Sequence, residues 1–207
     1  MTLPKKGDLG NCDNWKEISL LSVPSKIFCG ILLKRIHKAI DSTLKGEQAG
    51  FRRGRGCMDQ IFVLRNILEQ SLELNTSLCI NFIDFQKAFD SVHRESLCKI
   101  LQAYGLPPKI INLIKMFYDI FECSIILGNT IIGAFPVKSG VRQGCILSPI
   151  LFLVTIDWVM RQATSLRSRG IQWTISSLTF KTLTLLMILP SFLQHLLIFR
   201  RNQTILI

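Results

Sequence analysis

Acidic residues are missing from the C-terminal part of this 207-residue sequence. All fourteen Asp and Glu residues lie at or before Asp157, whereas basic residues and many Leu and Ile continue to the end. A charged chain that abruptly loses one class of residue has changed its selective regime at that point. We therefore interpret the last residues separately from the rest.

The sequence also contains no Cys-x-x-Cys pair, no internal repeat and no low-complexity tract. Its seven cysteines are an odd number, which argues against a disulfide framework, and their spacing argues against a zinc ribbon. We expect most of them to be small buried side chains in a reducing compartment. Residues 1–15 are polar and charged rather than signal-like, so we expect an intracellular protein, cytoplasmic or nuclear.

Positive charge is abundant, with a net charge of +11 and a pI near 9.6. This excess favours a polyanionic partner such as nucleic acid or an anionic membrane surface. The alternative is that the charge only solvates the surface. A chain of this length can bury one substantial core or two small lobes.

Apolar spacing and turn residues predict an α+β protein with packed helices around a short antiparallel sheet. Ser22 can cap a first helix, Pro24 suits its first turn, and Gly128-Asn129 is a hairpin signal. The predicted helices cover residues 22–40, 58–74, 94–104, 108–120 and 148–165, and the predicted strands cover 77–83, 122–127 and 130–137.

Residues 182–199 are apolar enough to resemble a membrane span. Pro190, Gln194 and His195 interrupt the run, so we favour a buried helix or a disordered tail over a membrane anchor. A small membrane-associated protein, or a basic nucleic-acid-binding protein without catalysis, remains the alternative reading of the chain.

The strongest local pattern is Asn-Phe-Ile-Asp-Phe-Gln-Lys-Ala-Phe-Asp-Ser-Val at residues 81–92. It places Asp84 at the end of an apolar strand, where a carboxylate is costly unless it is paired or bound to metal. Polymerases use such carboxylates to hold two divalent ions against a phosphate. Taken alone, a single Asp at this position is more often a strand cap or a turn former.

This block resembles the first catalytic motif of reverse transcriptases from non-long-terminal-repeat retrotransposons, and three further blocks resemble that family in the same order. Residues 5–26 resemble the opening of the fingers, and residues 46–55 match a Gln-x-Gly-Phe-Arg-x-Gly-Arg signature. Residues 140–149 match a Gly-x-x-Gln-Gly-x-x-x-Ser-Pro motif. The resemblance implies a fingers and palm fold and RNA-templated DNA synthesis from deoxynucleoside triphosphates, with an RNA template and a DNA primer as partners.

The resemblance also implies roles for individual residues. Asp84 would be the catalytic carboxylate and a Mg²⁺ ligand, joined by the backbone carbonyl of Phe85. Phe89 would lie under the nucleotide sugar, although it could instead pack in a core. Gln143 and Gly144 would contact the incoming nucleotide, and the glycine would permit close approach of the backbone.

Basic residues would bind the phosphates. Lys5 or Lys6, with Lys16, match fingers positions that hold the triphosphate, where Lys16 replaces the more usual arginine. Arg52, Arg53 and Arg55 would track template phosphates, or would otherwise form a solvated basic loop.

The family's Ala-Asp-Asp motif, which completes the metal site, should follow residues 140–165 but no acid follows Asp157. Synonymous codons for residues 181–193 can be chosen so that a shifted reading frame encodes Asp-Leu-Asp-Phe-Ala-Asp-Asp-Ile-Ala-Leu-Leu-Ser. We therefore expect a fingers-like region at residues 1–76, a partial palm at 77–173, and an out-of-frame tail at 174–207. The chain would be a truncated reverse transcriptase domain that is catalytically defective, with an incomplete Mg²⁺ site.

Overall fold

The chain divides into two compact units. Unit 1 comprises Met1–Leu44 and Lys87–Val159, and unit 2 comprises Lys45–Gln86 and Met160–Ile207. The computed structural model describes residues 2–4, 7–8, 10–11, 14–75, 78–81, 83, 85, 87–119, 122–127, 130–165, 171–172, 179–180 and 204–206.

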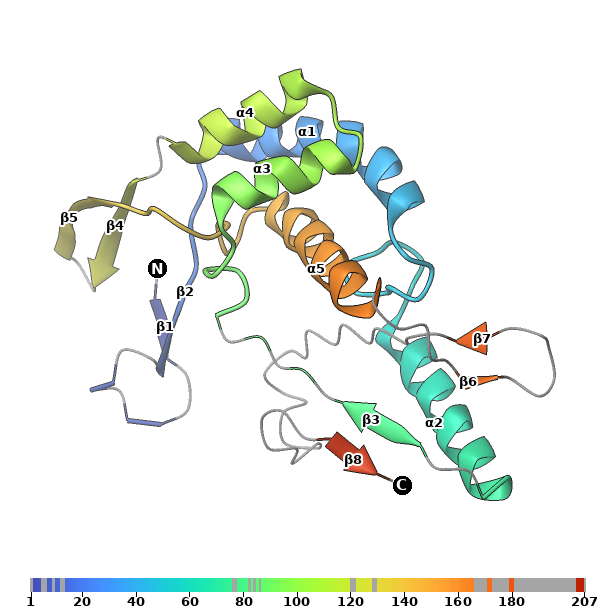
Figure 1. Cartoon of the computed structure of the whole chain (residues 1–207). Coiled ribbons are helices and arrows are strands. Elements are labelled where there is room, and N and C mark those ends of the chain that lie inside the picture. Colours follow the sequence, from blue (N-terminus) through green and yellow to red (C-terminus); the bar gives the residue numbers. More distant parts are fainter. Residues whose placement is uncertain are drawn as a thin grey trace. The chain divides into compact units, whose positions relative to one another are not determined.

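Unit 1 is built on α-helices that bury a common core. They are α1 (Val23–Thr43), α3 (Arg94–Ala103), α4 (Pro108–Asp119) and the first two thirds of α5 (Ser148–Ser165). Figure 1 shows α3 and α4 side by side. Helix α5 is buried almost all round over residues 150–154, as expected of a central helix rather than an amphipathic one.

Helix α1 begins and ends for local reasons. The Ser22 hydroxyl accepts a hydrogen bond from the backbone N–H of Ser25, and Pro24 lies in the first turn, so the predicted start is confirmed. Its buried stripe is Cys29, Leu32, Ile36 and Ile40. Ile27 and Ile31 share the helical spacing that favours a buried face, yet both side chains are exposed, so spacing alone does not predict their burial.

Two antiparallel strand pairs complete unit 1. Strand β4 (Glu122–Leu127) pairs with β5 (Thr130–Pro136), which confirms the predicted hairpin, while its turn residues lie outside the described residues. Strand β1 (Thr2–Pro4) pairs with β2 (Trp15–Glu17), where no strand was predicted. Strands of three residues are too short to show an alternating pattern in the sequence.

Unit 2 contains α2 (Cys57–Glu73) and short strand pairs. Strand β3 (Cys79–Asn81) lies within the predicted strand at 77–83 and pairs antiparallel with β8 (Thr204–Leu206), while β6 (Ile171–Gln172) pairs with β7 (Thr179–Phe180). Helix α2 buries Ile67 but leaves Phe62 and Leu72 exposed.

Helices and small antiparallel pairs confirm the α+β class, while the division into fingers, palm and tail stays a prediction. Within the described part of the chain, no helix combines the length and the apolar character needed to cross a bilayer. The apolar run at 182–199 lies outside the described residues.

Candidate functional site

The segment from Ser139 to Leu147 lies against the turn that holds Phe89 and Asp90. Gly140 donates its backbone N–H to the carbonyl of Val92 at 2.8 Å, and Val141 donates to the carbonyl of Phe89 at 2.8 Å. Gly140 has a φ of +81°, and a Cβ there would lie 2.7 Å from the Asp90 Cα. Only glycine fits this approach, so the two motifs are joined through their backbones.

Gln143 and Asp90 connect the same two motifs through their side chains. The Gln143 amide nitrogen lies 3.3 and 3.2 Å from the two carboxylate oxygens of Asp90, to which it donates. This contact orients an amide that was predicted to meet the incoming nucleotide. Asp90 was not among the predicted site residues, although its place in the first motif was the signal that could have found it.

Gly144 was predicted to let the backbone approach the incoming nucleotide. Among the described residues, the group that approaches it closely is the protein's own backbone at Ser19. Gly144 has a φ of +103°, and a Cβ would lie 2.6 Å from the carbonyl oxygen of Ser19. Ser19 also donates its N–H to the carbonyl of Gln143 at 2.7 Å. The chain leaving β2, the strand that contains Lys16, therefore lies beside the Gln143-Gly144 loop.

Two arginines that sequence reasoning missed fasten this loop to the end of α4. The Arg94 guanidinium donates to the carbonyls of Gly140, Ser139 and Tyr118 at 3.0, 3.1 and 3.1 Å. Arg142 donates to the carbonyl of Phe117 at 2.9 Å and lies 4.1 Å from the centre of that ring. Burial lowers the pKa of both side chains, yet each stays charged in the neutral range.

A buried cluster of polar and sulfur-containing side chains packs beside the loop of residues 139–147. The Tyr118 hydroxyl lies 3.2 Å from the Ser148 hydroxyl, and the Cys29 and Cys145 sulfurs lie 3.5 Å apart. Burial raises the pKa of Tyr118 to about 12, and burial together with the Cys145 contact raises the pKa of the Cys29 thiol to about 12. Both groups are neutral at physiological pH, so they pack and hydrogen-bond rather than react.

Phe89 is half-buried and stacks on Phe152 of α5, with ring centres 4.9 Å apart. The contact shows that the core-packing alternative considered for Phe89 is realised. Its predicted position under a nucleotide sugar stays a prediction.

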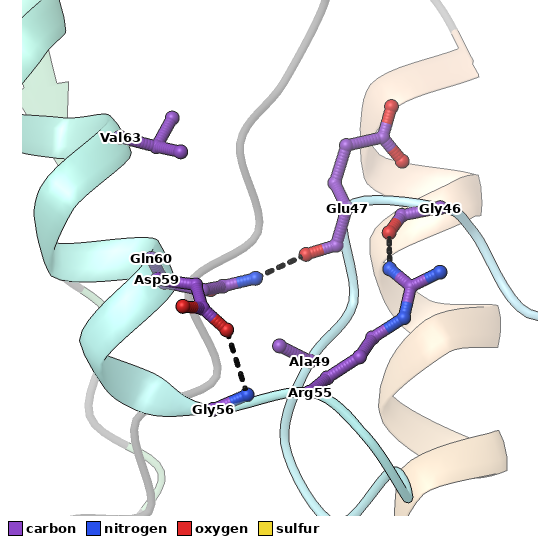
Figure 2. A pocket seen from close by; sticks show the side chains of 8 residues that line it. All are labelled: Gly46, Glu47, Ala49, Arg55, Gly56, Asp59, Gln60 and Val63. Atoms are coloured by element: carbon purple, nitrogen blue, oxygen red, sulfur yellow. Dashed lines mark hydrogen bonds between the residues drawn. The ribbon is translucent and has the colours of Figure 1, made fainter.

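The basic loop of unit 2 contains the three predicted phosphate-binding arginines. Arg52 turns inward, where one guanidinium nitrogen donates to the carbonyls of Lys45 and Gln48 at 2.8 and 3.0 Å. Arg55 is exposed but donates to the carbonyl of Gly46 (Figure 2). Arg53 is exposed.

A cavity of about 440 Å³ lies between this loop and the start of α2 (Figure 2). Its polar groups are largely used within the protein. Gln60 donates to the carbonyl of Glu47 at 2.6 Å, and the Asp59 carboxylate accepts the Gly56 N–H at 3.2 Å. The hydrogen bonds hold the loop against the helix.

The remaining predicted site residues are only partly visible. Asp84, Lys5 and Lys6 lie outside the described residues, the Lys16 backbone is described without its side chain, and Phe85 is half-buried. No cluster of three potential metal-ligating side chains occurs within the described part of the chain. The described carboxylate beside the loop, that of Asp90, already accepts the Gln143 amide, so the described donors do not form a two-metal site.

Comparison with known proteins covers most of the chain. Residues 3–175 match the family model described as reverse transcriptase (RNA-dependent DNA polymerase). A transposon TX1 uncharacterized 149 kDa protein from Xenopus laevis is 33% identical over 155 residues, which are 75% of this chain and 12% of that protein. The Pol polyprotein of a type-1 R2 retrotransposable element from Popillia japonica is 30% identical over 156 residues, covering 75% of this chain and 22% of that protein.

A third relative, the Pol polyprotein of the type-2 element R2DM from Drosophila melanogaster, is 30% identical over 159 residues, 77% of this chain and 15% of that protein. The chain thus spans only a small part of the length of these relatives. The matches confirm the resemblance found in the motifs. The chain belongs to the reverse transcriptase family, and its relatives are the reverse transcriptases of non-long-terminal-repeat retrotransposons.

Proposed function

We propose that this chain is a fingers and partial palm region of a retrotransposon reverse transcriptase that binds nucleic acid but does not catalyse DNA synthesis. In this proposal residues 1–76 are fingers, 77–173 are partial palm, and 174–207 are an out-of-frame tail. The partners are an RNA template, a DNA primer and deoxynucleoside triphosphates, inside the cell. The observation that carries the proposal is the hydrogen bond between Gln143 and Asp90, which joins the first catalytic motif to the Gln-Gly motif.

The family reaction consists mainly of positioning and electrostatic stabilisation. A primer 3′-hydroxyl attacks the α-phosphate of a nucleoside triphosphate, and pyrophosphate leaves. In this chain Gln143, oriented by Asp90, would contact the nucleotide, while Lys5, Lys6 and Lys16 would neutralise its phosphates. Phe89 would contact the sugar from its stack on Phe152.

Mg²⁺ would supply charge neutralisation of the phosphates, and Asp84 with the Phe85 carbonyl would be its ligands. One aspartate cannot hold two ions about 3.5–4 Å apart, so a second carboxylate segment is needed. No Asp or Glu follows Asp157 in the sequence. This absence supports the proposal that the chain is catalytically silent.

Nucleic-acid affinity is the retained property, and a salt titration tests it. The net charge of +11 predicts binding to RNA and DNA with little sequence preference. The affinity of the folded chain for a labelled oligonucleotide should fall steeply, by tenfold or more, between about 50 and 200 mM salt. Absence of binding by folded protein at the lowest salt would refute the proposal.

A further inference from the structure

The three arginines of the basic loop are not equivalent in the structure. Arg52 is half-buried, while Arg53 and Arg55 are exposed. A guanidinium that contacts phosphate must present its N–H groups to solvent before the nucleic acid arrives. The position of each guanidinium therefore separates residues that shape the loop from residues that can meet a ligand.

Arg52 closes the loop onto itself. One of its guanidinium nitrogens lies 2.8 Å from the Lys45 carbonyl and 3.0 Å from the Gln48 carbonyl, which join the start of the loop to its end. The backbone adds isolated turns, in which Gln48 donates to Lys45, Arg52 to Ala49 and Arg55 to Arg52 at 3.2, 3.3 and 3.4 Å. Two further side chains contact the start of the loop, since Arg55 donates to the Gly46 carbonyl and Gln60 donates to the Glu47 carbonyl, so Arg52 is one of the contacts that close it.

Arg53, the next residue, differs from Arg52 in its exposure. The Arg53 side chain is exposed and forms no hydrogen bond or ion pair with any described residue. The first acidic residue of the adjoining helix, Asp59, accepts the Gly56 N–H. Arg55 shares its guanidinium with the Gly46 carbonyl, so Arg53 is the arginine of this loop with all its donors available among the described residues.

We propose that Arg52 is a positioning residue that closes the basic loop, and that Arg53 is the principal phosphate contact presented by that loop. The inference rests on the proposed nucleic-acid affinity. It departs from the equal roles that the motif implied for the three arginines. The ligand is a phosphodiester backbone, because an exposed guanidinium with its donors available can donate to phosphate oxygens without reading bases.

The test compares single substitutions in the full chain by two measurements. The first is the salt dependence of binding to a labelled oligouridylate of about 16 nucleotides. Arg53→Gln should weaken binding at low salt by about three- to tenfold and should reduce the slope of log K against log salt by about 0.7, the value for one phosphate contact on a single strand. Arg52→Lys should keep the slope of the unaltered chain.

The second measurement is hydrogen exchange of the amides of residues 45–55 in the free protein. Arg52→Gln should accelerate this exchange, and Arg52→Lys, which keeps a donor and the charge, should restore part of the protection and the affinity. Arg53→Gln, the matched control with the same change of charge, should leave the exchange unaltered. These readouts separate a loop-closing role from a direct phosphate contact.

The proposal is overturned if Arg52→Gln exchanges like the unaltered chain, or if Arg53→Gln keeps the original salt slope. Failure of the unaltered chain to bind at low salt would overturn both the proposed nucleic-acid affinity and the Arg53 contact. The exchange comparison would still decide whether Arg52 closes the loop.

Discussion

At the scale of single residues, Gly144 shows why a motif glycine can be required before any ligand is considered. It combines a φ of +103° with a Cβ position only 2.6 Å from the Ser19 carbonyl oxygen. An added methyl group would have to displace backbone rather than a flexible side chain. The loop that contains Gln143 would move with it.

We expect Gly144→Ala to lower the free energy of unfolding by about 2–4 kcal/mol, from backbone strain and displacement together. Gly54→Ala is the matched control, because Gly54 also has a positive φ of +74° but has no atom within 4 Å of an added Cβ. It should cost about 1 kcal/mol. Urea unfolding of both variants measures the difference, and equal losses would show that the Ser19 contact is unimportant.

Tyr118 predicts a dependence of stability on alkaline pH. Burial raises its pKa from 10.0 to about 12, so the unfolded state loses the phenolic proton before the folded state does. The stabilisation is complete below pH 10 and is lost as the pH rises to about 12. Its size is at most about 2.7 kcal/mol, from a shift of two pKa units.

Tyr118→Phe removes this titration while keeping most of the ring packing. At neutral pH the variant should be slightly less stable, by about 1 kcal/mol, since the contact with Ser148 is lost. Between pH 10 and 12 the unaltered chain should lose more stability than the variant. If the unaltered chain and the variant lose the same free energy of unfolding between pH 10 and 12, the burial of the Tyr118 phenol is not the cause.

At the scale of elements, the loop before α5 depends on arginine contacts with backbone carbonyls. Arg94 donates to three carbonyls that belong to two separate segments, the loop at Ser139-Gly140 and the end of α4. Its removal would leave these carbonyls to water or unpaired. Charge-assisted hydrogen bonds of this kind are stronger than neutral ones.

Arg94→Ala should therefore lower the free energy of unfolding by about 2–4 kcal/mol and accelerate amide exchange in residues 139–145. The control is Arg65→Ala on the exposed face of α2, where Arg65 pairs with Glu69 at 2.8 Å. An exposed ion pair contributes little, so that variant should melt like the unaltered chain. Equal effects of the two substitutions would refute the role assigned to Arg94.

Elements whose signals are local could be predicted from the sequence. Ser22 and Pro24 mark the start of α1, and the apolar strands around residues 128–129 predict the β4–β5 hairpin, because each signal lies within a few residues of its effect. The β1–β2 pair and the contact between Ser19 and Gln143 were missed. The β1–β2 strands are too short to show an alternating pattern, and the Ser19–Gln143 contact joins residues far apart in sequence, so local periodicity encodes neither.

The candidate site also has some features that the sequence predicted and others that it did not. The motifs predicted which segments matter, and Gln143 does lie against the end of the first motif through Asp90. Arg94 and Arg142 escaped notice because their acceptors are backbone carbonyls, which every residue has. The inward turn of Arg52 could not be predicted for the same reason.

At the scale of the whole molecule, the family membership and the proposed lack of catalytic activity rest on different observations. Membership follows from the family match over residues 3–175. The proposed loss of catalysis is a separate inference, which rests on the lack of Asp and Glu in residues 158–207, where the Ala-Asp-Asp motif was expected. In the proposed account, a shift of reading frame between residues 174 and 181 replaced the Ala-Asp-Asp motif with the apolar run.

Primer extension on an RNA template with Mg²⁺ is the measurement that tests this account most directly. It compares the unaltered chain, a version with the frame restored between residues 174 and 181 and continued downstream, and that version with Asp84→Ala. We predict extension only by the frame-restored protein, with rates lower by about a thousandfold or more in the other two. Robust Mg²⁺-dependent extension by the unaltered chain would contradict the account.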